Sequence, residues 1–94
     1  MGRPRKTTAE RHWEAIGRRL ATLRVAVAPD VSQSEFCRVL RVGKSQWNQF
    51  ETGERKITTE VALKLKHRYG VTTDWIYDND PSQLPFDLHQ KIAV

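Results

Sequence analysis

The stretch SQSEFCRVLRVGKSQWNQFETGER, residues 32–55, contains the pattern that decides the fold. It predicts two short helices joined by a tight turn at residues 41–43. Ser32 and Glu35 have the spacing of a capping box, in which each side chain accepts a hydrogen bond from the other residue's backbone amide. The apolar residues of the first helix follow the i, i+3, i+4 spacing of one helix face: Phe36, Val39 and Leu40.

The second helix of this stretch has two different sides. Trp47 and Phe50 form its apolar inner side. Its outer side carries hydrogen-bonding side chains rather than alternating Glu and Lys. Amides of this kind pair with base edges, and Gln or Asn pairs with adenine in particular. We therefore interpret residues 32–55 as a helix-turn-helix whose recognition helix carries Lys44, Ser45, Gln46, Asn48 and Gln49.

The length and composition indicate a single all-α domain. Ninety-four residues suffice for one helical core. The single cysteine, Cys37, excludes an internal disulfide and a Cys-based zinc site, and its place beside Phe36 predicts a small buried residue. No apolar run has the length of a membrane span, and the N-terminus lacks a signal-peptide core. We expect a soluble, cytoplasmic protein.

The positive charge is concentrated in the N-terminal part of the chain. Residues 1–56 carry 12 Lys and Arg against 6 Asp and Glu, whereas residues 57–94 carry 4 against 5. The surplus therefore lies in the same part of the chain as the helix pair. This asymmetry predicts a polyanionic partner on one side of the domain.

The first eight residues predict a disordered basic arm. They include Gly2-Arg3-Pro4-Arg5-Lys6, which resembles the centre of an AT-hook, a segment that lies in the minor groove of A·T-rich DNA. A narrow minor groove attracts arginine because its negative potential is enhanced. One interpretation therefore places Arg3, Arg5 and Lys6 in that groove. The other is a solvated tail that adds only unspecific attraction to phosphates.

The rest of the chain predicts four more helical segments, three of them before residue 79 and the last in the C-terminal tail. A long amphipathic helix over about residues 9–26 has one apolar stripe. Gly53 closes the recognition helix. A fourth helix, capped by Thr58 or Thr59, ends at Gly70, and a short fifth helix follows the cap at residues 72–74. The stripe of the first helix is Trp13, Ile16, Leu20, Leu23 and Val27.

Residues 79–94 form a C-terminal tail with a last helical turn or two beginning at Pro85. The tail has more apolar residues than a frayed end needs: Phe86, Leu88, Ile92 and Val94. Either it packs on its own domain or it contacts the same tail of a second subunit.

These motifs together resemble the phage-repressor, or Cro/Xre-type, helix-turn-helix domain. The similarity covers about residues 15–78 and is strongest over residues 32–37, 40–43 and 47–55; residues 69–76 resemble the end of the family pattern. The resemblance implies a five-helix, lambda-repressor-like bundle over residues 9–78, here followed by the short helical tail. It also implies that the protein binds DNA operators as a homodimer and belongs to a prokaryotic cell or phage, where it associates with the nucleoid.

The resemblance also assigns roles to individual residues. It implies that Lys44, Ser45 and Gln49 read bases in the major groove, with Gln46 and Asn48 beside them. Trp47 occupies an apolar position that faces the core, and Arg24 and Glu51 match a pair that ties the first helix to the third. The implied contacts to the DNA backbone are Gln33, Ser34, Arg55 and Lys56.

Two residues of the turn depart from the family pattern. Arg41 replaces a glycine and would need a left-handed backbone conformation that costs on the order of 1 kcal/mol. Gly43 stands where a Ser or Thr would cap the recognition helix, so it supplies no side-chain cap.

The leading function is a sequence-specific transcriptional regulator that binds a palindromic operator. Two alternatives remain: the antitoxin of a toxin–antitoxin pair, and a protein-interaction module that uses this fold without DNA. An enzyme is not expected, because His12, His67 and His89 lack metal-ligand spacing and no Ser or Cys has a visible base partner. We expect no cofactor, no metal, no membrane partner and no small-molecule ligand.

Overall fold

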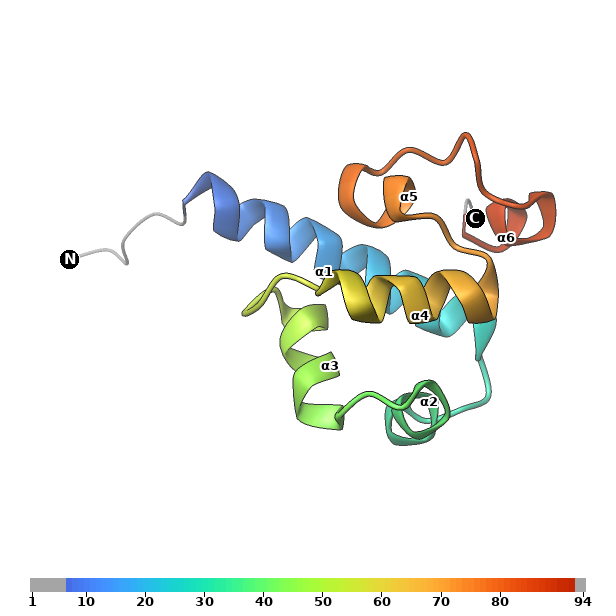
Figure 1. Ribbon diagram of the computed structural model, residues 1–94, viewed down its shortest axis with the longest axis horizontal. Coiled ribbons are helices and arrows are strands. Elements are labelled where there is room, and N and C mark those ends of the chain that lie inside the picture. Colours follow the sequence, from blue (N-terminus) through green and yellow to red (C-terminus); the bar gives the residue numbers. More distant parts are fainter. Residues whose placement is uncertain (1–6, 93–94) are drawn as a thin grey trace.

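The computed structural model describes residues 7–92, and every regular element among them is a helix. Figure 1 shows the long first helix passing behind the fourth helix, with the second and third helices below these two and the last two above them. The elements are α1 (Thr8–Val27), α2 (Gln33–Leu40), α3 (Lys44–Thr52), α4 (Thr59–Tyr69), α5 (Thr73–Asp78) and α6 (Phe86–Ile92). The predicted all-α architecture of five helices and a helical tail is confirmed.

Local capping explains where these helices begin. The side-chain oxygens of Thr7, Ser32, Thr58 and Thr72 each accept a hydrogen bond from the backbone amide three residues later, at 3.1 to 3.3 Å. Such a cap satisfies one of the amides that a helix start leaves without a partner. The caps at Ser32 and Thr58 are those predicted, whereas Thr7 begins α1 one residue earlier than the sequence indicated.

The core is built from residues of all six helices, and α1 contacts α3, α5 and α6. Ile16, Leu20 and Leu23 of the α1 stripe are buried, while Trp13 and Val27 at its ends are half-buried. Phe36 joins two neighbours in this core: its ring centroid lies 5.0 Å from that of Trp47 and 5.8 Å from that of Tyr69. Aromatic contacts of this kind add to the stabilisation from buried area. The core thus holds α2, α3 and α4 together.

The C-terminal tail packs on its own domain. Leu88 is buried with the main core, Ile92 packs against it, and α6 contacts α1. Phe86, in contrast, is 73% exposed. The structure therefore shows the first of the two predicted roles for the tail, and it leaves one large apolar side chain on the surface. Val94 lies outside the described residues.

Cys37 is buried in the core, as predicted for a small packing residue. Burial raises the pKa of its thiol, because desolvation disfavours the thiolate, and the nearby Glu51 carboxylate raises the pKa further. The side chain is therefore a neutral packing group.

Candidate nucleic-acid interface

The N-terminus of α2 is built as half of the predicted capping box. Ser32 Oγ accepts a hydrogen bond from the Glu35 amide at 3.1 Å. The predicted second hydrogen bond, from the Ser32 backbone amide to the Glu35 carboxylate, is wrong. Both carboxylate oxygens of Glu35 accept hydrogen bonds from the Arg38 guanidinium instead. An arginine one turn later offers a charge-assisted partner that competes with a neutral backbone amide. The helix start is still capped, but by one hydrogen bond rather than two.

The turn between α2 and α3 contains the left-handed residue that its position in the family pattern implies. Arg41 adopts the left-handed conformation, with φ 61° and ψ 49°. Its backbone N–H donates to the Arg38 carbonyl at 3.2 Å, and the Val42 N–H donates to the Cys37 carbonyl at 3.0 Å. The prediction that Arg41 takes a glycine-like conformation is confirmed.

Lys64 of α4 stabilises this turn from outside the helix pair. Its Nζ donates a hydrogen bond to the Arg41 carbonyl oxygen at 2.8 Å. The contact fixes the peptide next to the left-handed residue, and α4 thereby supports the connection between α2 and α3. Sequence reasoning missed it because 23 residues separate the two partners and no local rule links them.

The two sides of α3 differ as the sequence predicted. Trp47 and Phe50 are 0% and 2% exposed, so they belong to the core, and the assignment of Trp47 to packing is confirmed. Gly43 is the N-cap residue of α3 and supplies no side-chain cap. The outer side brings together four exposed residues, Lys44, Ser45, Gln46 and Asn48, and half-buried Gln49.

A partly buried polar cluster ties α3 to α1. Glu51 accepts hydrogen bonds from Arg24 Nε at 2.8 Å and from Arg24 Nη2 at 3.3 Å. The same carboxylate accepts a hydrogen bond from Trp47 Nε1. The hydrogen bond to Glu51 raises the pKa of Arg24, so the guanidinium stays charged. The predicted Arg24–Glu51 pair is therefore present, with the Trp47 indole as a third member.

Two glycines allow the backbones of α1 and α3 to touch. A Cβ added at Gly17 would lie 2.4 Å from the Glu51 carbonyl oxygen and 2.6 Å from that of Phe50. A Cβ added at Gly53 would lie 2.7 Å from Glu14 Cα, and Gly53 has a positive φ of 82°. Gly53 was predicted as the end of α3. The role of Gly17 was missed, although a glycine next to the apolar stripe of a long helix is the available signal.

The predicted contacts to the DNA backbone flank the recognition helix. Gln33 and Ser34 form the first turn of α2, where free backbone amides favour a phosphate oxygen. Arg55 and Lys56 are exposed between α3 and α4. Lys56 Nζ lies 5.3 Å from the centroid of the Tyr77 ring, so its position is set partly by α5.

Tyr77 of α5 holds the segment that follows α3. Its hydroxyl donates a hydrogen bond to the Ile57 carbonyl at 3.0 Å. The Arg55 amide donates to the Gln49 carbonyl at 3.2 Å, which folds the segment back on the end of α3. These bonds fix the backbone that carries Arg55 and Lys56, while both side chains remain exposed.

The predicted minor-groove residues Arg3, Arg5 and Lys6 lie outside the described residues. Within residues 7–92, no group of three or more His, Cys, Asp or Glu side chains is placed to hold a metal ion. None of the helices in that range is both long and apolar enough to cross a membrane.

A family model described as a helix-turn-helix domain matches residues 15–75, more than half of the chain. Searches among curated proteins and solved structures give no significant match. The chain belongs to the helix-turn-helix domain family, in agreement with the resemblance to the Cro/Xre type. Membership in this family indicates a DNA-binding regulator.

Proposed function

We propose that the protein is a sequence-specific transcriptional regulator that reads an operator through the major groove. The observation that carries the proposal is the two-sided recognition helix. Its inner residues Trp47 and Phe50 are buried, and its outer side presents Lys44, Ser45 and Gln46 to solvent. Amide and ammonium groups on such a side match the donors and acceptors of base edges.

Contacts to phosphates supply affinity and orientation in this proposal. The first turn of α2 and the exposed Arg55 and Lys56 stand on either side of α3 along the chain. Contacts of this kind fix the register of a protein on the duplex but carry no sequence information. They also release counterions, so binding weakens steeply as salt rises.

The protein binds as a dimer in this proposal. A two-fold dimer places two recognition helices about 34 Å apart, one turn of the double helix, and requires a palindromic site. The C-terminal tail itself packs on its own domain, so the proposed dimer contact is made through its exposed side chain Phe86.

Selection of bound sites from random DNA, followed by a salt series, tests the proposal. Gln49→Ala is expected to weaken binding to the selected site by about 1–3 kcal/mol and binding to random DNA much less, because one good base contact has that magnitude. The matched control is Gln83→Ala, since Gln83 is exposed in the segment before α6. Equal losses on both DNAs would exclude base reading by Gln49, and failure to select any site would overturn the proposal.

A further inference from the structure

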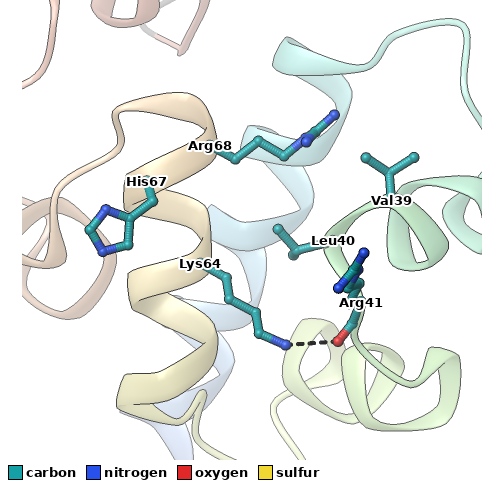
Figure 2. A pocket seen from close by; sticks show the side chains of 6 residues that line it. All are labelled: Val39, Leu40, Arg41, Lys64, His67 and Arg68. Atoms are coloured by element: carbon teal, nitrogen blue, oxygen red, sulfur yellow. Dashed lines mark hydrogen bonds between the residues drawn. The ribbon is translucent and has the colours of Figure 1, made fainter.

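A cleft of about 400 Å³ lies between the C-terminal end of α2 and the outer side of α4. Figure 2 shows Val39, Leu40 and Arg41 on one wall and Lys64 and Arg68 on the other, with the imidazole of His67 pointing away from the opening. None of these residues is among the predicted DNA contacts. The residues that line the cleft are Val39, Leu40, Arg41, Lys64, His67 and Arg68.

The charged groups around this cleft are all positive. Arg41 and Arg68 are exposed, and the lining includes no carboxylate. Lys64 donates one hydrogen bond to the Arg41 carbonyl (Figure 2), which leaves two ammonium hydrogens for another partner. Ion pairs join Arg24 to Glu51 and Arg38 to Glu35, and neither pair uses one of the cations of the cleft. The cleft therefore attracts a negatively charged group.

The cleft adjoins a second hollow along α2 that is lined mainly by apolar residues, and we call the two together the groove. Val39 and Arg68 also line this second hollow of about 370 Å³, which reaches the loop between α1 and α2. An inorganic anion or a DNA phosphate would use the cations but not this apolar wall. The lining of the second hollow includes the carboxylates of Asp30 and Glu35, which disfavour negative charge there. The second hollow is further lined by Val27, Ala28, Pro29, Asp30, Val31, Glu35, Phe36 and Tyr69.

We propose that this groove binds an acidic, apolar segment of a partner protein. Carboxylates of the segment pair with Arg41, Lys64 and Arg68, and its apolar side chains pack on Val39 and in the second hollow. Charge complementarity and the apolar wall together select such a segment over either property alone. None of the residues that line the cleft is a predicted DNA contact, and in this proposal DNA and the partner bind at the same time.

The test uses the full chain and a short fluorescein-labelled synthetic peptide with glutamates at one end, for the cleft, and leucines at the other, for the hollow beyond it. Saturable binding is expected in fluorescence anisotropy, and backbone amide shifts in NMR are expected at residues 39–41 and 64–68. A peptide with glutamine in place of glutamate, and another with serine in place of leucine, should each bind much more weakly. Absence of binding, or shifts centred on α3, would overturn the proposal.

Arg68→Glu is expected to weaken peptide binding by about tenfold, because it places a like charge beside the peptide's carboxylates. The neutral variant Arg68→Gln should give a smaller loss. Lys66→Glu is the matched control, because Lys66 is exposed on the same helix but does not line the cleft. An equal loss of peptide binding in Lys66→Glu would mean that binding depends only on the overall charge of the protein, and it would overturn the proposal.

A DNA-binding assay on the same samples separates this inference from the proposed function. Arg68→Glu should bind the selected DNA as the unmodified protein does. A loss of DNA binding as large as the loss of peptide binding would instead make Arg68 a phosphate contact. The peptide measurements need no DNA, so they stand whether or not an operator is found.

Discussion

Arg41 places a long side chain at a backbone position that suits glycine. The left-handed conformation brings Cβ close to the following carbonyl oxygen, which costs about 1–2 kcal/mol in a residue with a side chain. The Lys64 hydrogen bond to the Arg41 carbonyl does not involve the Arg41 side chain, so it survives substitution there. The free-energy cost of the left-handed conformation is therefore confined to Arg41.

Arg41→Gly is expected to stabilise the protein by up to about 1 kcal/mol, since relief of the left-handed strain exceeds the entropy that glycine loses on folding. Thermal unfolding measures the change. Arg38→Gly is the matched control: Arg38 is helical, so the same substitution should destabilise by about 1 kcal/mol. A clear loss of stability in Arg41→Gly would contradict the left-handed turn.

Gly17→Ala is expected to destabilise the protein by about 2–3 kcal/mol, because the new methyl group would overlap the Glu51 and Phe50 carbonyls and force α1 from α3. Chemical denaturation measures this loss. Gly43→Ala provides the comparison, since a Cβ there meets only Gln46 Cβ at 3.8 Å, and it should cost less than about 1 kcal/mol. Equal effects of the two variants would exclude close backbone contact as the role of Gly17.

The helix α3 is held to α1 by polar groups as well as by packing. The side chains of Arg24 and Glu51 are only 20% and 11% exposed, so neither is well solvated. Removing one member of such a pair leaves the other poorly compensated, which costs more than an exposed pair contributes. The cluster therefore fixes the orientation of the recognition helix.

Glu51→Gln is expected to destabilise the protein by about 1–3 kcal/mol, because the Arg24 guanidinium and the Trp47 indole lose a charged acceptor. Glu35→Gln removes the same charge from an exposed pair with Arg38 and should have a much smaller effect, because solvent screens an exposed pair. Denaturant unfolding of both variants gives the comparison. A loss no larger in Glu51→Gln than in Glu35→Gln would contradict the structural role of the cluster.

Elements set by local rules were predictable from the sequence, and contacts between distant segments were mostly not. The caps at Ser32 and Thr58 depend on residues three apart, and the conformation of Arg41 follows from the turn that it occupies. The Arg24–Glu51 pair came only from the family resemblance. The close approach at Gly17 and the Lys64 bond depend on how helices cross, which periodicity does not specify.

The candidate site shows the same division. The buried side of α3 follows from its periodicity, so the opposite side, with Lys44, Ser45, Gln46, Asn48 and Gln49, was predictable. The groove along α2 was not, because it forms only where α2, α4 and the loop after α1 come together. The second bond of the capping box was predicted wrongly, since the spacing of Ser32 and Glu35 does not reveal the competing Arg38.

At the scale of the whole molecule, Phe86 is the most exposed large apolar side chain among residues 7–92. Phe86→Ser is expected to weaken dimer formation by about tenfold or more, since loss of a buried aromatic contact costs well over 1 kcal/mol. Sedimentation over a concentration series measures the association. Leu63→Ser, on α4 and 40% exposed, is the control and should leave association unchanged. A monomeric unmodified protein would remove the proposed tail contact.

The contact of α1 and α3 through Gly17 and Gly53 has a consequence for redesign. The backbone of α3 is positioned by its inner residues and by glycine contacts, none of which lies on the outer side. The position of α3 against α1 therefore does not change when the exposed residues are substituted, namely Lys44, Ser45, Gln46 and Asn48. If these residues read DNA as proposed, new operator preferences are accessible by exchanging them alone, and the domain is a natural scaffold for a library of altered specificities.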